Sequence, residues 1–276
     1  MVDFLMFDGR RPELPESKIK DQKSNIITAV LFDLGDTLLE FGKINTTTAF
    51  LEGARMTHAF LKDHDQPVAC FPWYFLRNLV RLRIRYLVAD LLRRDFDSLV
   101  VLQAVGAKLG VRLSQEQWEQ FAWLWYEPLS RCARIEDGLP ETLACLKRMG
   151  LKLGIVSNTF VNRASLAQHL RLLGLLEFFP MQLYSYEFHV RKPSTEIFRI
   201  AAGKIGEPAP NILFVGDRID NDIAPALQSG MRAALKEAHT NRGKKAPAAA
   251  LKIGRLAELP ALIERINAAQ VPTTAT

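Results

Sequence analysis

Three short apolar runs, each ended by a polar residue, constrain the fold of this chain more than any other feature. They lie at residues 26–32 (IITAVLF), 151–156 (LKLGIV) and 211–215 (NILFV). Runs of this length, rich in large and β-branched residues, are typical of strands buried on both faces. Asp33, Ser157 and the pair Gly216-Asp217 follow them directly, so each strand is expected to end in a polar turn.

The second half of the chain alternates between strand and helix patterns. Helices are predicted over residues 140–149, over a segment that ends at Leu173, from Pro193 as the first helical residue, and over residues 259–268. Weaker strands are expected at residues 182–185 and 233–235. Strands alternating with helices favour a parallel, doubly wound sheet. We therefore predict an α/β fold with a three-layer α/β/α Rossmann-like core.

The block between the first two apolar runs has a different pattern of apolar residues. From about residue 45 to 135, apolar residues recur at helical spacing and no strand is evident. We expect an all-α domain over 45–135, inserted into a core formed by 26–44 and 136–276. Residues 1–25 combine charged residues and prolines without a sustained period, which predicts an N-terminal extension loosely laid on the surface.

Composition excludes several classes of protein. The chain of 276 residues is 48% hydrophobic and 24% charged, and its apolar stretches fall short of the roughly 20 residues that span a bilayer. The net charge of +6 comes without a block of like charge, so neither a nucleic-acid nor a membrane partner is expected. Cys70, Cys132 and Cys145 are too widely spaced for a disulfide framework, which indicates a reducing, cytoplasmic location. A monomer or a homodimer is expected.

Polar residues at the ends of the predicted strands are the candidates for chemistry. In open α/β sheets the ligand site lies at the carboxyl ends of the strands. Asp33, Ser157 and Asp217 occupy such ends, and Lys192 precedes a predicted helix between the last two. Taken singly, each has an ordinary structural explanation, because an Asp after a strand commonly caps a helix and a Lys is usually solvated.

Taken together and in order, four segments resemble the motifs of the haloacid dehalogenase superfamily. They are VLFDLGDTL, GIVSN, RKP and FVGDRIDNDI. The resemblance covers the core from about residue 26 to 45 and from 135 to 240. It implies that the helical insert is the family's cap domain, of the variety placed after the first motif.

The resemblance also implies a role for each matching residue. Asp33 would be the nucleophile of an aspartyl-phosphate mechanism, and a cation is needed because a carboxylate and a phosphate repel each other. Mg²⁺ would be held by Asp33, the backbone carbonyl of Gly35, Asp217 and Asp222. Catalysis and phosphate binding would involve Ser157, Lys192, Thr37 and Asn158, whereas Asp220 and Asn221 are as consistent with a helix cap. The substrate would be a small phosphorylated metabolite.

Gly35 departs from the pattern of the family. Most phosphatases of the family carry a second Asp there, which protonates the leaving group and then activates water. Glycine keeps the backbone carbonyl but removes an acid/base commonly worth about 10²–10⁴-fold in rate. Asp36 is an imperfect substitute. In an extended segment, side chains two residues apart point to the same side, so position 35 shares a side with Asp33 whereas Asp36 points elsewhere.

Three hypotheses follow from this departure. The first is an active Mg²⁺-dependent phosphatase that uses water, Asp36 or a cap group as acid/base, or that acts on substrates with good leaving groups, such as acyl phosphates and sugar 1-phosphates. The second is a protein that binds phosphate ligands or a protein partner and turns over slowly or not at all. The third is a dehalogenase on the same fold. The intact nucleophile, Ser, Lys and acidic residues favour the first.

The helical insert is expected to select the substrate, with hinges near Gly42 and near Asp137-Gly138. Arg77, Arg81 and Arg85 recur every four residues and would line one side of a helix, as a solvated face or as a basic surface for an anionic ligand. Trp118 and Trp125, with Phe121 and Leu124 between them, read as the packed face of a helix. His58 and His64 are expected to be surface or packing residues.

Overall fold

The structure, a computed structural model, describes residues 26–42, 45–92 and 94–270. The predicted N-terminal extension over residues 1–25 therefore lies outside the described residues. Six strands form one sheet: β1 (Ala29–Phe32), β2 (Lys152–Ser157), β3 (Met181–Tyr184), β4 (Ile212–Gly216), β5 (Arg232–Lys236) and β6 (Leu251–Ile253). Their order is β3-β2-β1-β4-β5-β6, and every neighbouring pair is parallel.

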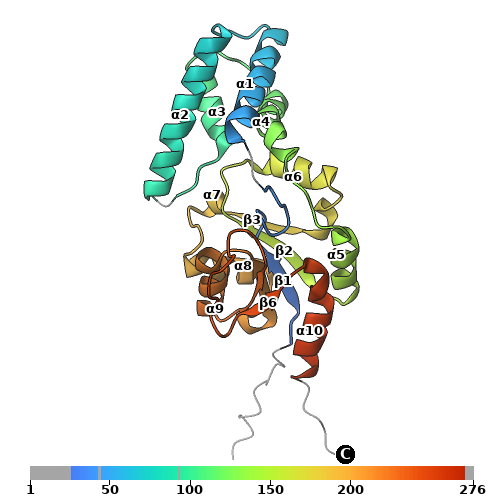
Figure 1. The fold of residues 1–276 in the computed structure, drawn as a ribbon. Helices are drawn as coiled ribbons and strands as arrows, with labels where there is room; N and C mark the ends of the chain where they lie inside the picture. The colour runs from blue at the N-terminus through green and yellow to red at the C-terminus, as the bar shows by residue number, and fades with distance from the viewer. Residues whose placement is uncertain (1–25, 43–44, 93, 271–276) are drawn as a thin grey trace, which may run out of the picture.

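Helices cover both faces of this sheet (Figure 1). The helices of the core are α5 (Leu139–Arg148), α6 (Arg163–Leu172), α7 (Ser185–Phe188), α8 (Thr195–Ile205), α9 (Ala224–Gln228) and α10 (Leu259–Ala268). Short turns of helix lie at Leu176–Phe178, Ala209–Asn211, Ile219–Ile223 and Leu256–Glu258. The arrangement confirms the predicted three-layer α/β/α core with a parallel sheet.

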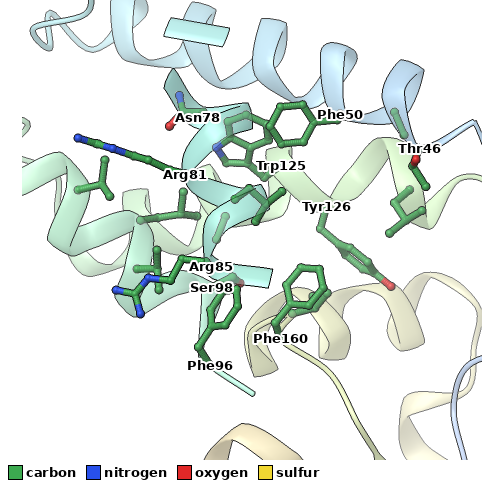
Figure 2. Close-up of a pocket in the computed structure, with 18 residues that line it drawn as sticks. Thr46, Phe50, Asn78, Arg81, Arg85, Phe96, Ser98, Trp125, Tyr126 and Phe160 are labelled. Carbon is green, nitrogen blue, oxygen red and sulfur yellow. The ribbon is translucent and has the colours of Figure 1, made fainter. Parts of the chain in front are cut away.

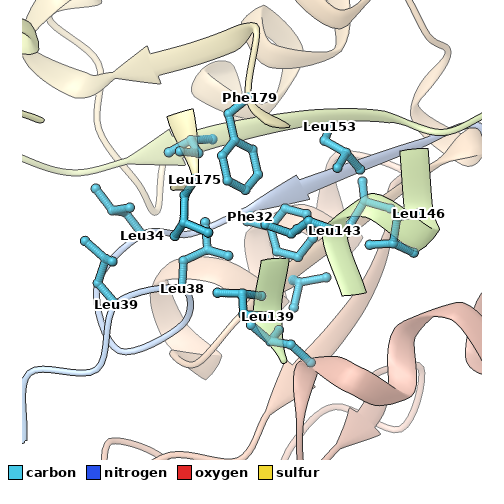
Figure 3. Close-up of a cluster of buried hydrophobic side chains, with 14 of the residues drawn as sticks. Phe32, Leu34, Leu38, Leu39, Leu139, Leu143, Leu146, Leu153, Leu175 and Phe179 are labelled. Atoms are coloured by element: carbon cyan, nitrogen blue, oxygen red, sulfur yellow. The ribbon is translucent and has the colours of Figure 1, made fainter. Parts of the chain in front are cut away.

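The central strand β1 shows why the sheet needs helices on both sides. Its residues are fully buried and alternate between two apolar clusters, as side chains of a strand point to opposite faces. Val30 and Phe32 contact the cluster that includes Leu143 of α5, drawn in Figure 3, whereas Leu31 packs with Phe198 of α8. The continuous apolar run at residues 26–32 follows from this double burial.

Two details of the core differ from the sequence prediction. Helix α8 begins at Thr195 rather than at Pro193, because residues 191–194 form a turn, in which the Ser194 N–H donates to the Arg191 carbonyl at 3.0 Å. The Ser194 hydroxyl then caps the helix by accepting from the N–H of Glu196 at 3.3 Å. Strand β6 was not predicted, because three residues with Lys252 in the middle carry no clear strand pattern.

Four helices between β1 and α5 lie together beyond the sheet (Figure 1). They are α1 (Thr46–Asp63), α2 (Phe71–Leu92), α3 (Ser98–Ala107) and α4 (Gln115–Ser130), and they enclose an apolar cluster of their own. Trp118 and Phe121 are buried in it, as the sequence predicts. The ring of Trp118 lies against Gly106 of α3, where an added Cβ would come within 2.3 Å of the ring.

Two further features belong to this helical block. Both histidines contact backbone carbonyls inside it, since His58 Nε2 lies 2.9 Å from the Ala69 oxygen and His64 Nδ1 lies 2.8 Å from the Phe60 oxygen. The outer side of α2 carries exposed apolar residues, among them Trp73 and Leu91. No helix in the described ranges combines the length and the apolar character needed to cross a bilayer.

The chain passes between the sheet and the four helices through two segments that are joined to each other. Glu40 and Arg134 exchange two backbone hydrogen bonds of 2.8 Å, close to the predicted hinges at Gly42 and Asp137-Gly138. Buried Lys236 of β5 holds both segments, with its Nζ 2.7 Å from Glu40 and 3.0 Å from Glu136. Burial disfavours the Lys236 ammonium, but the two carboxylates outweigh this effect and raise its pKa.

Candidate active site

The carboxyl ends of three adjacent strands bring the predicted site residues to one edge of the sheet. Asp33 follows β1, Ser157 ends β2 and Asp217 follows β4. The N–H of Asp33 continues the sheet by donating to the Val215 carbonyl at 2.9 Å. Asp33, Ser157 and Asp217 are all buried, with at most 8% of each residue exposed. The parallel register thus places residues that are distant in sequence side by side.

Three carboxylates and one ammonium form the centre of this site. Oxygens of Asp33, Asp217 and Asp222 all lie within 4.8 Å of one another. The Nζ of Lys192 lies 2.5 Å from Asp33 Oδ1 and 2.6 Å from Asp222 Oδ1. Asp222 is completely buried, and its second oxygen accepts from the Arg218 N–H at 2.9 Å.

Burial and like charge dominate the electrostatics of the cluster. Burial raises the pKa of Asp33 to about 7, with Asp222 and Asp217 acting in the same direction and Lys192 opposing them. Burial also raises the pKa of Asp217, and Asp222 and Asp36 add to that effect. For Lys192, burial alone would lower the pKa, but Asp222 and Asp33 outweigh it and raise the pKa.

The donor set fits a hard divalent cation. Three carboxylates lie together and one ammonium contacts two of them, so ionising all three concentrates negative charge in a buried cluster, at a high cost inside a protein. Carboxylate oxygens are the ligands that Mg²⁺ and Ca²⁺ prefer. Asp33, Asp217 and Asp222 would hold such an ion. The role of the Gly35 carbonyl as a fourth ligand stays a prediction.

The side chain of Asn158 forms two hydrogen bonds with the backbone of Lys192. Its Oδ1 accepts from the Lys192 N–H and its Nδ2 donates to the Lys192 carbonyl, both at 2.8 Å. Both polar atoms of this side chain are therefore engaged by the residue that contacts Asp33. The predicted phosphate-binding residue Asn158 is thus placed as a positioning residue for Lys192, and a direct role toward phosphate stays a prediction.

Asp217 is held by three residues, two of which the sequence did not suggest. Thr37, completely buried, donates to Asp217 Oδ1 at 3.2 Å. Thr240 donates to Asp217 Oδ2, and Asn241 donates to the Asp217 backbone carbonyl at 2.8 Å. Thr240 and Asn241 follow β5, the neighbour of β4. A polar pair after the next strand of a parallel sheet is the signal that could have identified them.

Gly35 faces a cavity, whereas the side chain of Asp36 binds a backbone N–H. Gly35 lines a cavity of about 310 Å³, here called the site cavity, together with Ser157 and Asn158. Apart from its two chain neighbours, no atom of the described residues lies within 4 Å of the position that a Cβ on Gly35 would take. Asp36 has a φ of 55°, and its side chain accepts from the Phe41 N–H at 3.3 Å. The glycine therefore leaves open space where the family's second Asp would stand.

Asp220, which the sequence leaves open between a site role and a helix cap, lies outside the cluster. Asp220 forms an exposed ion pair with Arg218 at 2.7 Å.

The loop between α2 and α3 contributes Asp95 to the wall of the site cavity. Arg191 lines the same cavity and forms an ion pair with Asp95 at 3.3 Å. Ser185 donates to the second Asp95 oxygen at 2.5 Å. The helical block therefore contributes a carboxylate that is tied to the core beside the site.

Comparison with known proteins agrees with this arrangement. The chain is 38% identical over 217 residues to a glyceraldehyde 3-phosphate phosphatase of Methanopyrus kandleri, which covers 75% of this chain and 82% of that protein. A phosphatase of the same name from Methanocaldococcus jannaschii is also 38% identical, over 91 residues that cover 33% of this chain and only 39% of that protein.

Solved structures give the same overall fold. A phosphatase from Thermococcus onnurineus covers 86% of this chain and 98% of its own, with a TM-score of 0.56 and 22% identity. A 2-haloacid dehalogenase from Pseudomonas syringae covers 87% of this chain and 100% of its own, with a TM-score of 0.56 and 25% identity. The fold thus hosts two chemistries, and it does not distinguish between them.

A family model decides membership. The model of the haloacid dehalogenase-like hydrolases matches residues 27–230, which include β1, the four inserted helices and the strands β2, β3 and β4. The match therefore spans most of the chain and every residue of the acidic cluster. The chain belongs to the haloacid dehalogenase-like hydrolase family.

Proposed function

We propose that this chain is a Mg²⁺-dependent phosphatase that passes the phosphoryl group of a small phosphorylated metabolite to Asp33 and then to water. One observation carries the proposal: the oxygens of Asp33, Asp217 and Asp222 lie within 4.8 Å of one another, with Lys192 bound to two of them. The phosphatase from Methanopyrus kandleri, 38% identical over 217 residues, supports it.

The residues divide the chemistry among themselves. A carboxylate oxygen of Asp33 attacks phosphorus, an O–P bond forms, and the bond to the leaving oxygen breaks on the opposite side. Lys192 orients the Asp33 carboxylate and offsets charge on the phosphoryl oxygens, and the Ser157 hydroxyl donates to one of them. Bound Mg²⁺ would supply further positive charge to the same oxygens. Water then releases phosphate from Asp33.

Gly35 sets the kind of substrate. With no carboxyl group at this position, leaving groups that depart with little protonation are favoured, as in acyl phosphates and sugar 1-phosphates. Alkyl phosphates, whose alkoxides need a proton, should react slowly. The open space beside Gly35 leaves room for a water molecule in the acid/base role.

The test is hydrolysis of p-nitrophenyl phosphate and acetyl phosphate with and without Mg²⁺. Asp33→Asn serves as the blank, because it keeps the size of the side chain and removes the nucleophile. We expect turnover that requires Mg²⁺ and that disappears in Asp33→Asn, and Asp217→Asn should shift the Mg²⁺ titration to higher concentration. Wild-type activity in Asp33→Asn would contradict the assignment of the nucleophile.

A dehalogenase is the second candidate, favoured by the likeness to the Pseudomonas syringae enzyme and by the missing acid at Gly35. In that reaction Asp33 would displace halide from carbon and form an ester, which water hydrolyses without a metal. The crowding of Asp217 and Asp222 beside Asp33 counts against it. Chloride release from 2-chloropropionate by metal-free protein, with no phosphatase activity, would establish this alternative.

A further inference from the structure

A second cavity opens next to the site cavity, inside the helical block. It has a volume of about 270 Å³ and lies among α1, α2, α3 and α4. We call it the helix cavity. The two cavities share a set of wall residues, namely Phe96, Leu129, Tyr126, Phe160 and Val161. A molecule bound beside Gly35 and Ser157 would therefore have the helix cavity on the other side of these side chains.

The walls of the helix cavity suit a flat apolar group. Phe50 and Trp125 pack with ring centroids 4.9 Å apart, and Phe96 and Phe160 stack at 5.6 Å with an interplanar angle of 19°. Aliphatic side chains such as Val101 complete the wall. Figure 2 shows the rings of Phe50, Trp125, Phe96 and Phe160 around this cavity. Apolar surface moved from water into such a cavity is stabilised in proportion to its area.

The wall that the two cavities share is held in place. The hydroxyl of Tyr126 lies 3.0 Å from Nδ1 of buried His169, and burial lowers the pKa of His169 to about 4, so this ring is neutral at ordinary pH. Across the same wall, Ser98 of α3 donates its N–H to the Phe160 carbonyl at 2.9 Å. The two cavities are therefore neighbours, and the wall that they share is fixed by hydrogen bonds.

Arginines stand at one end of the helix cavity. Figure 2 shows the guanidinium groups of Arg81 and Arg85 on the same side, away from Thr46 and Tyr126. Nη1 of Arg81 is shielded from solvent and has no hydrogen-bond partner among the residues that the structure describes. A shielded cationic donor is stabilised by an anionic acceptor, and this one adjoins an apolar cavity.

We propose that the substrate is a phosphate compound whose leaving group carries a flat apolar body, seated in the helix cavity, and an anionic end group directed to Arg81. This inference rests on the proposed phosphatase function and adds a substrate class to it. Glyceraldehyde 3-phosphate, the substrate in the name of the relative, has no apolar body to fill this cavity. The helix cavity would thus separate the specificity of this chain from that of the relative.

The test compares three aryl phosphates in the presence of Mg²⁺: p-nitrophenyl phosphate, biphenyl-4-yl phosphate and 4′-carboxybiphenyl-4-yl phosphate. Val101→Phe fills the helix cavity, and Val100→Phe is the matched control because Val100, on the same helix, is 59% exposed. We expect Val101→Phe to lower kcat/KM for both biphenyl compounds at least about 10-fold, the scale of a methylene-sized change in an apolar pocket. It should leave p-nitrophenyl phosphate nearly unchanged, and Val100→Phe should change none of the three.

Arg81→Met supplies an independent arm that does not fill the cavity. It should remove the preference for the carboxylated biphenyl over the plain one and leave p-nitrophenyl phosphate unaffected. Intact turnover of p-nitrophenyl phosphate with no discrimination by either variant would overturn the substrate class while leaving the phosphatase in place.

Binding of biphenyl-4-carboxylate, followed by titration calorimetry, keeps the inference separate from the proposed function. If no phosphate compound is hydrolysed at all, the proposed function fails. The helix cavity is then judged by this binding alone: saturable binding that Val101→Phe abolishes and Val100→Phe retains upholds it as a ligand site. Absence of binding to the folded wild-type protein overturns it.

Discussion

Asn158→Ala should reduce both stability and activity, for two different reasons that can be separated. The substitution removes two hydrogen bonds of 2.8 Å to the backbone of Lys192. Each such bond contributes about 0.5–1.5 kcal/mol, so the free energy of unfolding should fall by about 1–3 kcal/mol. Activity should fall as well, because Lys192 no longer sits firmly against Asp33, and a shift of roughly 1 Å in a catalytic group can cost about 10²-fold in rate.

The Lys192→Met background distinguishes these effects. The hydrogen bonds from Asn158 reach the Lys192 backbone, which the methionine retains, so Asn158→Ala should cost the same stability there as in the wild type. Its effect on kcat/KM should vanish, since the ammonium that Asn158 positions is already absent. Urea denaturation and p-nitrophenyl phosphate hydrolysis with Mg²⁺, on all four proteins, complete the cycle.

One result would refute the reasoning. If Asn158→Ala lowers the residual activity of Lys192→Met by the same factor as it lowers that of the wild type, Asn158 acts on the substrate directly. It would then belong among the phosphate-binding residues. A cycle in which stability, rather than activity, is non-additive would equally contradict the separation of the two roles.

Three other substitutions test particular features of the structure. Lys236→Met should cost about 1–3 kcal/mol of stability, because it leaves Glu136, whose side chain is only 11% exposed, without its cation, and Glu136→Gln in that background should restore part of the loss in urea denaturation. Since the Lys236 pKa is raised in the folded state, the wild type should lose this contribution as pH rises through that pKa, and a flat alkaline profile would argue against it. Gly216→Ala would place a Cβ 2.5 Å from the Asp222 Cβ, so a folded variant should need more Mg²⁺ for activity, and an unchanged titration would speak against Asp222 as a ligand. Gly35→Asp has open space around the new side chain and should raise hydrolysis of alkyl phosphates at least about 10-fold, while no gain in a folded variant would mean that another group already supplies the proton.

The strands and the convergence of polar residues could be predicted because both depend on local pattern and on the parallel sheet. Asp33, Ser157 and Asp217 follow strands that the sheet places side by side, so their proximity follows once the strands are recognised. The start of α8 could not be placed, because the turn before it competes with the preference of Pro193 for a first helical turn.

Contacts within and between loops lie beyond such reasoning. Asn158 and Lys192, which are joined by hydrogen bonds, lie 34 residues apart in the sequence, and Thr240 and Asp217 lie 23 residues apart. Each depends on the path of a loop rather than on periodicity. The helix cavity likewise could not be predicted from the sequence, because it is the space that the packed side chains of four helices leave unfilled.

The strand order also determines when the sheet can form during synthesis. Strand β1 is made first, but Ala29 pairs with Lys152 on one side and with Ile212 on the other. At roughly 5–20 residues per second, the ribosome needs about 10–40 s to add the intervening residues up to β4. Strand β2 is made before β4 and is the first partner available to β1, whereas α1 to α4 are made earlier still and make contacts that are nearer in sequence. The helical block can therefore become ordered on the ribosome before the sheet that carries the nucleophile, and exposure of β1 is the step at which a nascent chain would depend on chaperones.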